Sequence, residues 1–262
     1  MRGFKLNDLL RVDLDRLWQR HIEMAKLGAT EAGGVNRAAL TNPDIELHWQ
    51  LASWARKRNF VVEIDPYGNQ FMRRAGTDQA CAPLVSGSHS DTQPTGGRFD
   101  GISGVLAAVE ALEVIDDAQI CTRHPIEVVI WNNEEGARFH PSDMGSAVYV
   151  GDTPISSMLT ATDQEGMSMA TAVKALRSRV DWAIDRPLGA PIASYLELHI
   201  EQGPILEKEK IDIGIVTGIQ GARKFEVQVI GEEAHAGTTP QKDRQDAFLE
   251  ACLLYTSPSP RD

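Results

Sequence analysis

Histidine and carboxylate residues gather in four short stretches of this sequence, each at or near the end of an apolar segment. The first stretch, residues 87–92, reads Gly-Ser-His-Ser-Asp-Thr. His89 and Asp91 are two residues apart, so on an extended chain both side chains point to one face. A carboxylate in this position can accept one imidazole N–H and leave the other nitrogen as a better metal ligand. Taken alone, such a pair is also typical of a protein surface.

The other three stretches have equally simple alternative explanations. Residues 96–104 contain four glycines and place Asp100 where a helix is expected to begin, so Asp100 could simply cap that helix. Glu134 and Glu135 follow an apolar strand, where neighbouring carboxylates repel each other without a cation, although a solvated acidic loop has the same sequence pattern. His199 lies in an alternating strand, where a single histidine is usually structural.

The four stretches together predict more than each does alone. Two histidines with two or three carboxylates at strand ends form the ligand set of a dinuclear metal centre, in which one carboxylate bridges two ions about 3.5–4 Å apart. Mixed imidazole and carboxylate ligands suit Zn or Mn rather than an ion that prefers thiolates. Open α/β sheets also place their active sites at strand ends.

The elements that must position these residues alternate between helix and strand. Apolar periodicity predicts helices near residues 9–22, 42–57, 104–115 and 171–177. It predicts strands near residues 60–65, 70–74, 83–91, 126–134, 194–202, 211–219 and 222–232. Strands interleaved with apolar helices indicate an α/β fold whose sheet is covered by helices on both faces. The last two strands are expected to form an antiparallel pair, and this change to successive strands predicts a second domain from about residue 211.

Composition and charge exclude several classes of protein. The 262 residues are 42% hydrophobic, which is ordinary for a globular chain of one large domain or two smaller ones. A net charge of −11 argues against a surface for nucleic acid or anionic membranes. Cys81, Cys121 and Cys252 are too widely spaced for a disulfide framework or a metal knuckle, so the cytoplasm is expected. The N-terminal residues carry no apolar export or membrane-spanning segment, so a soluble protein is expected.

The last eleven residues, 252–262, are expected to be foreign to the protein. The string CLLYTSPSPRD follows an expected helix over residues 244–251 and is expected to end it abruptly. It resembles one reading frame of a transposase sequencing adapter, although a genuine Ser/Pro-rich tail is the alternative. We therefore expect the natural sequence to continue beyond Ala251, and we expect the 262-residue fragment to have little activity of its own.

Four motifs identify a family resemblance. They are GSHSDTQPTGGRFDGISGVLAAVEAL, WNNEEGARF, ELHIEQGP and GEEAHAGTTP. In this order and spacing they resemble the amidase/hydantoinase/carbamoylase branch of the dinuclear zinc metallopeptidases, over roughly residues 5–251. The resemblance implies a zinc-exopeptidase-like catalytic domain with a mixed sheet (residues 1–211) and the start of a smaller α+β dimerisation or lid domain (residues 212–251). It also implies a homodimer and two divalent ions, which could be Zn, Mn, Co or Ni.

The resemblance assigns a role to eight residues. His89 and His199 would bind one metal, Glu135 would bind the second, and Asp100 would bridge the two metals. Glu134 would be the general base, and Asp91 would support His89. Gln202 would contact the substrate, and His235 would reach the partner's active site and stabilise the oxyanion. The family's last histidine ligand, and the Asn and Arg that bind the substrate carboxylate, have no counterpart in this sequence. Ser90 stands where relatives often carry an apolar residue.

The implied reaction is hydrolysis of an N-carbamoyl-L-amino acid to the amino acid, ammonia and carbon dioxide. A water between the two metals would lose a proton to Glu134, attack the carbonyl, and the proton would then pass to the leaving nitrogen. Allantoate amidohydrolases and ureidopropionases are the nearest alternatives in the same branch. An aminoacylase or peptidase, or an inert metal-binding or dimerising fragment, are further alternatives.

Overall fold

The computed structural model describes residues 10–219, 221 and 226–256, and it divides the chain into two units. The first unit ends at Glu209 and the second begins at Lys210. The predicted metal ligands, Asp91 and Gln202 all lie in the first unit, whereas His235 lies in the second.

The first unit is built on a six-stranded sheet in the order β5-β1-β2-β4-β3-β6. The strands are β1 (Val61–Ile64), β2 (Gln70–Arg74), β3 (Leu84–His89), β4 (Ile126–Trp131), β5 (Ile184–Asp185) and β6 (Ser194–Leu196). β2 is antiparallel to both β1 and β4, while β3 is parallel to β4 and β6. This mixed sheet with its helices confirms the predicted α/β fold class.

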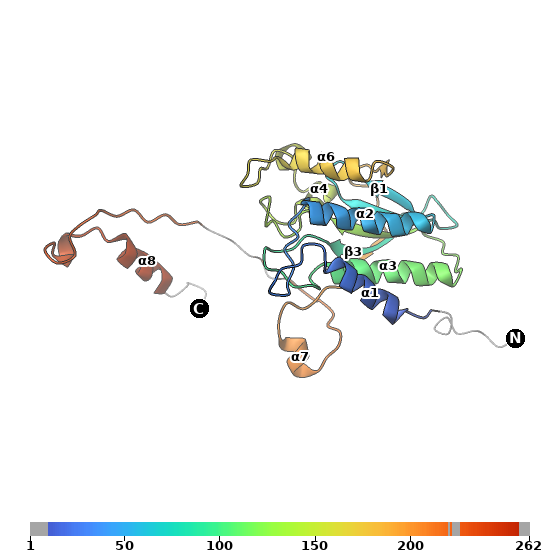
Figure 1. Ribbon diagram of the computed structural model, residues 1–262, viewed down its shortest axis with the longest axis horizontal. Coiled ribbons are helices and arrows are strands. Elements are labelled where there is room, and N and C mark those ends of the chain that lie inside the picture. The colour runs from blue at the N-terminus through green and yellow to red at the C-terminus, as the bar shows by residue number, and fades with distance from the viewer. Residues whose placement is uncertain (1–9, 220, 222–225, 257–262) are drawn as a thin grey trace. The chain divides into compact units, whose positions relative to one another are not determined.

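Some helices pack directly against the sheet, and others pack against those helices (Figure 1). Their bounds are α1 (Leu14–Met24), α2 (Asn42–Lys57), α3 (Ile102–Asp117), α4 (Met144–Val150), α5 (Ile155–Met158), α6 (Met169–Arg179) and α7 (Ile205–Glu209). α2 and α3 pack directly on the strands, and α1 and α6 pack in turn on α3 and α2. Their apolar side chains form the larger of two buried clusters.

Side-chain alternation along β4 explains how the sheet separates the two clusters. Val128 and Ile130 point toward α2 and α3 in the larger cluster, whereas Val129 and Trp131 point to the opposite face. There they pack with Phe71 and with Tyr149 of α4. β4 is therefore buried on both faces, which matches its unbroken apolar sequence.

The expected strand at residues 194–202 is much shorter in the structure. β6 ends at Leu196, and residues 197–200 have no regular structure. Gln202 has a φ of 55°, which no extended strand can accommodate. His199 consequently projects from an irregular segment rather than from a strand.

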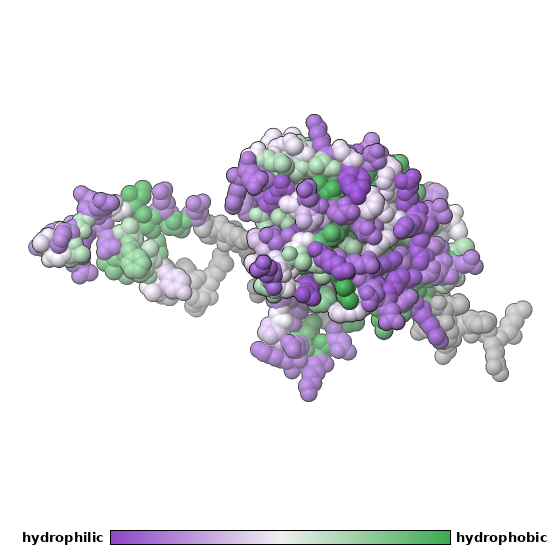
Figure 2. Space-filling view, viewed as in Figure 1, coloured by the Kyte–Doolittle hydropathy of each residue, from purple (hydrophilic) through white to green (hydrophobic). Residues whose placement is uncertain are grey.

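The expected antiparallel pair at residues 211–219 and 222–232 is wrong for the residues that the structure describes. Neither residues 211–219 nor residues 226–232 contain a strand; residues 220 and 222–225 lie outside the described part. Ile213, Ile215, Val227 and Ile230 are 67–88% exposed, and Figure 2 shows hydrophobic residues on the surface of this unit. A two-stranded hairpin without an apolar face to pack on is marginal, which explains the difference.

The expected end of the last helix is also wrong. α8 runs over Ala247–Thr256, so it begins later than residue 244 and continues through Cys252. No proline or glycine interrupts the chain before Pro258, and nothing else there opposes a helix. A short 3₁₀ helix, Gln241–Asp243, precedes α8.

Among the described residues, no helix combines the length and the apolar character that crossing a bilayer requires.

Candidate metal centre

The strand topology brings four distant parts of the chain to one edge of the sheet. β4, β3 and β6 are neighbouring parallel strands, so their carboxyl ends lie at the same edge. His89 is the last residue of β3, Glu134 follows β4, and His199 follows β6. Asp100 comes from the loop that joins β3 to α3. The predicted convergence of these residues is therefore what the fold produces.

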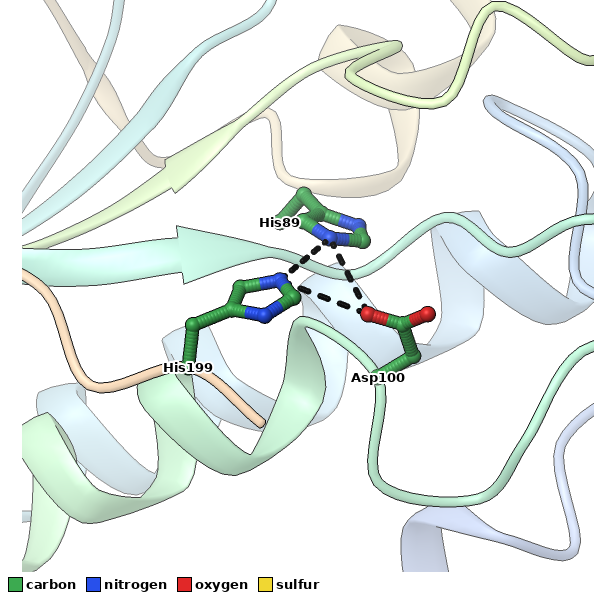
Figure 3. Close-up of side chains that lie close together, drawn as sticks. All are labelled: His89, Asp100 and His199. Carbon is green, nitrogen blue, oxygen red and sulfur yellow. Dashed lines mark hydrogen bonds and ion pairs between the residues drawn. The ribbon is translucent and has the colours of Figure 1, made fainter. Parts of the chain in front are cut away.

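Three of these side chains lie in one cluster (Figure 3). The Nε2 atoms of His89 and His199 are 3.4 Å apart. Oδ1 of Asp100 lies 3.3 Å from Nε2 of His199 and 3.9 Å from Nε2 of His89. Ligand atoms about 2 Å from a tetrahedral ion are about 3.3 Å apart, so these separations suit one shared cation.

A second group of potential ligands shares His89. Oε2 of Glu134 lies 3.5 Å from Nε2 of His89. The ligand atoms of His89, Glu134 and Glu135 all lie within 4.8 Å of one another. Glu135 also accepts a hydrogen bond of 2.7 Å from Nε2 of Gln93, which holds its carboxylate at the rim of the cluster.

Hydrogen bonds to the other ring nitrogens define which imidazole atoms face the cluster. Nδ1 of His89 lies 2.9 Å from the main-chain oxygen of Asp91, and Nδ1 of His199 lies 2.9 Å from that of Ile200. A carbonyl can only accept, so both Nδ1 atoms carry the proton in the neutral rings. The two Nε2 lone pairs then face each other, which is favourable only around a cation or a proton.

Asp100 supplies the strongest indication that a cation belongs here. Its Oδ1 is buried and has no hydrogen-bond partner in the described part of the chain, whereas Oδ2 accepts a 2.8 Å bond from Nε2 of Gln202. The N-cap of α3 is Gly101, without a side-chain cap, so capping does not account for Asp100. A buried acceptor without a donor beside two imidazole lone pairs fits a divalent metal ion.

Gly101 allows Asp100 to approach His89 this closely. Its φ is 63°, and a Cβ atom at this position would lie 2.4 Å from Cε1 of His89. Any other residue would displace the imidazole or the loop. The glycine-rich sequence before α3 is thus explained by packing of main chain against the histidine ring.

Asp91 contacts the cluster differently from the sequence expectation. Its carboxylate does not accept the His89 N–H, because Oδ1 is 3.8 Å from Nδ1 and the Asp91 carbonyl takes that bond. Instead, Oδ1 accepts the main-chain N–H of Glu134 at 3.2 Å and Oδ2 accepts that of Glu135 at 3.1 Å. Asp91 therefore joins the loop of His89 to the loop of the two glutamates.

Burial and nearby charge shift the pKa values of the cluster. Burial opposes the charged form of His89, but the carboxylates of Asp91 and Glu134 outweigh it and raise its pKa. Burial raises the pKa of Glu134, and the neighbouring Asp143 and Glu135 carboxylates raise it further. A carboxylate with a raised pKa is a stronger base than an ordinary carboxylate, which suits it to accepting a proton.

His235 lies in the second unit and has a defined tautomer there. Its Nδ1 accepts the main-chain N–H groups of Gly237 and Thr238 at 3.0 and 3.1 Å. The ring proton of the neutral side chain is therefore on Nε2, which leaves a hydrogen-bond donor. Of the eight residues singled out from the sequence, the structure brings His89, Asp91, Asp100, Glu134, Glu135, His199 and Gln202 together.

Sequence reasoning missed a buried amide network behind the two glutamates. Oδ1 of Asn69 accepts the main-chain N–H of Asn132 at 2.9 Å, and Nδ2 of Asn69 donates to Oδ2 of Asp65 at 2.7 Å and to the Gly145 carbonyl at 2.9 Å. All three polar side chains are essentially inaccessible to solvent. Asn132 lies two residues before Glu134, so the β1–β2 turn supports this end of β4. The only sequence signal near these residues is the turn-forming sequence Pro-Tyr-Gly-Asn at residues 66–69.

The chain is similar in sequence to proteins named as amidohydrolases and as a deiminase. The chain is 44% identical over 240 residues to the N-carbamoyl-L-amino-acid amidohydrolase of Rhizobium meliloti, which covers 91% of this chain and 57% of that protein. It is 38% identical over 243 residues to the N-carbamoyl-L-amino acid amidohydrolase of Geobacillus stearothermophilus, covering 92% and 59%. An allantoate deiminase of Arabidopsis thaliana is 34% identical over 211 residues, covering 78% and 40%.

The chain is also similar to a solved structure and matches a family profile. The crystal structure of a hydantoinase/carbamoylase family amidase from Burkholderia ambifaria superposes with a TM-score of 0.77 at 43% identity, covering 95% of this chain and 60% of that one. The chain thus spans less than two thirds of the length of these relatives. Their names and identities confirm the family resemblance that the sequence motifs predicted. The profile of Peptidase family M20/M25/M40 matches residues 85–255, well over half of the sequence, so the chain belongs to this family.

Proposed function

We propose that the protein carrying this chain is a metal-dependent amidohydrolase that cleaves the carbamoyl C–N bond of N-carbamoyl-L-amino acids. The observation that carries the proposal is the buried Oδ1 of Asp100, which faces the Nε2 atoms of His89 and His199 and has no hydrogen-bond partner among the described residues. The names of the relatives at 44% and 38% identity support this substrate class. Because the chain spans under two thirds of those relatives, the activity is proposed for the whole protein.

The ligand assignment rests on the first group of side chains for one ion and on the family resemblance for the other. His89, His199 and Asp100 would hold one divalent ion, and Asp100 and Glu135 would hold a second. Zn, Mn, Co and Ni all accept such ligands. When bound, the ions supply a Lewis acid for the substrate carbonyl and lower the pKa of water.

Glu134 is the proposed general base. Its carboxylate lies beside the cluster, and its raised pKa suits a group that takes a proton from water and returns it to the leaving nitrogen. Asp91 fixes the main chain of Glu134 and Glu135 through two hydrogen bonds. It thereby sets the direction of the base relative to the ligands.

Two further residues are proposed to bind the substrate. Gln202 contacts Asp100 and stands at the exposed side of the cluster. His235 carries a proton on Nε2, and this N–H would donate a hydrogen bond to the oxyanion that develops on the carbonyl. We propose that it does so in the partner's active site of a homodimer, and that this homodimer is cytoplasmic. Residues 1–211 would form the catalytic domain, and residues 212–251 would form part of the dimerisation domain. In this proposal, residues 252–262 are foreign.

An ammonia-release assay tests the assignment. The whole protein, supplied with Zn or Mn, is expected to release ammonia faster from N-carbamoyl-L-methionine than from β-ureidopropionate or allantoate, and the 262-residue chain is expected to release little. Faster release from allantoate would move the substrate to that of the deiminase relative. No release from any of the three would contradict the proposal.

Two neighbouring substitutions separate base from ligand. Glu134→Gln is expected to abolish turnover while leaving metal content unchanged, because Glu134 acts on the proton. Glu135→Gln is expected to lower the content of the second metal. Equal metal loss in both variants would contradict the division of roles.

A further inference from the structure

Ser90 separates His89 from Asp91, and its side chain points away from both into the core. It is 1% exposed. Its Oγ donates a 2.6 Å hydrogen bond to Oδ1 of Asp44 and lies 3.3 Å from Nε2 of His48. Asp44 and His48 are one turn apart on α2 and are equally buried. The hydroxyl of Ser90 therefore ties the end of β3 to the first two turns of α2.

The main chain of Ser90 is held by a second buried group. Nε of Arg37 donates a 2.8 Å hydrogen bond to the Ser90 carbonyl, and the Arg37 side chain is itself 1% exposed. Nη1 of Arg37 donates to the carbonyls of Met24 and Leu27. The guanidinium is thus fixed from three directions, and it fixes the peptide that links Ser90 to Asp91.

We propose that Ser90 is a positioning residue of the metal centre: its contacts with Asp44 and Arg37 fix the three-residue segment that carries His89 and Asp91. One end of that segment is a proposed metal ligand. The other end, through the Asp91 carboxylate, holds the N–H groups of Glu134 and Glu135. Movement of Ser90 would therefore displace both halves of the centre together.

The chemistry of the contact makes this role specific to the hydroxyl. Asp44 is a buried carboxylate, and its Oδ2 accepts the Leu40 N–H while its Oδ1 depends on Ser90. A buried carboxylate oxygen that loses its hydrogen-bond donor is costly, so the surrounding chain is expected to shift until another donor reaches it. An apolar residue at position 90 would fill the space but leave that oxygen unsatisfied.

The inference rests on the metal site proposed above, and metal binding is its first test. Ser90→Ala is compared with Ser86→Ala, which removes a hydroxyl from β3 that makes no hydrogen bond within the described part of the chain. Zn affinity of the purified chain, measured by competition with a chromophoric chelator, is expected to fall about tenfold in S90A, the lower end for supporting residues. S86A is expected to bind as the unmodified chain does, and equal affinity in S90A and S86A would overturn the proposal.

Hydrogen exchange provides a readout that needs no metal. The amide protons of Glu134 and Glu135 in the metal-free chain are expected to exchange about tenfold faster in S90A and at the unmodified rate in S86A. A uniform acceleration over the whole first unit would indicate lost stability instead, and would overturn the proposal. If the unmodified chain binds no Zn, the metal site proposed for these residues fails, while this measurement still decides the role of Ser90.

A conservative series guards against failure of S90A to fold. Ser90→Thr keeps the hydroxyl and is expected to keep the affinity for Zn even if the added methyl group lowers the melting temperature. Ser90→Cys keeps the volume with a weaker donor and is expected to bind Zn more weakly than S90T. Affinity that follows melting temperature across the series, rather than the donor, would contradict the positioning role.

Discussion

The carboxylate of Asp91 accepts the main-chain N–H of Glu134, a residue on the neighbouring strand's loop, at 3.2 Å. The same carboxylate accepts the N–H of Glu135 with its other oxygen. The loop that carries the proposed ligand His89 and the loop that carries the proposed base Glu134 are therefore joined by one buried side chain.

Asp91→Asn should uncouple these loops. The amide keeps one acceptor oxygen but turns an N–H₂ group toward the second main-chain N–H, so one of the two bonds is lost. We expect kcat of the whole protein to fall about 10–100-fold, as for other residues that support metal ligands. Asp181→Asn, at an exposed position, serves as control and should leave kcat unchanged. A wild-type kcat in D91N would contradict this role.

Asn69→Ala should destabilise the first unit. The substitution removes the acceptor of the Asn132 N–H and the donor to Asp65, and it leaves both partners buried. We expect a loss of about 2–4 kcal/mol in the free energy of unfolding by urea. Asn36→Ala, at an exposed asparagine, should change it by less than about 0.5 kcal/mol. Equal effects of the two substitutions would show that the network does not support β4.

Stability should fall as the pH rises through the titration of Asp65. Burial raises the pKa of Asp65 to about 6, against 3.8 as its ordinary value. The folded chain then binds this proton more tightly than the unfolded chain, so protonation stabilises the fold. The contribution is fully present below about pH 4 and is lost by about pH 6, in total about 3 kcal/mol.

Asp65→Asn cannot titrate and isolates this contribution. Urea unfolding at pH 4.5, 5.5 and 6.5 should show the unmodified chain losing stability relative to D65N as the pH rises. A constant difference between the two proteins over this range would refute the assignment of the proton to Asp65.

The ion pair between α1 and α3 should contribute to stability. Arg16 donates two hydrogen bonds, 2.7 and 2.8 Å long, to the buried carboxylate of Glu110. Glu110→Gln should cost about 1–3 kcal/mol in unfolding free energy, because a neutral amide replaces the buried charged acceptor of the Arg16 guanidinium. Asp78→Asn, in the exposed pair with Arg123, should cost less than about 0.5 kcal/mol. A similar cost in both variants would mean that burial of Glu110 is unimportant.

Local sequence signals predicted most of the first unit because its elements are strongly patterned. The helix expected at residues 42–57 and the strand expected at 70–74 have the bounds of α2 and β2. Short elements such as α5 and β5 carry too few residues for a periodic signal. The pair expected after residue 211 failed in the described residues, because strand formation depends on a partner surface that a local pattern does not supply.

In the candidate site, too, local sequence predicted some features, and others depended on contacts between distant segments. Residue types and spacing identified His89, Asp100 and His199, which the structure brings together. The contact between the Asp91 carboxylate and two main-chain N–H groups was not predictable, because it depends on how two loops meet. Ser90 was noted only as unusual, and its contacts with Asp44 and Arg37 arise from segments about 50 residues away.

Calorimetric titration of the 262-residue chain with Zn tests the metal centre most directly. We expect the unmodified chain to bind Zn, and we expect His199→Ala to weaken binding by more than about 100-fold, since supporting residues alone are worth 10–100-fold. His140→Ala removes an exposed histidine outside the cluster and should bind as the unmodified chain does. Undiminished Zn binding in H199A, or none in the unmodified chain, would contradict the account.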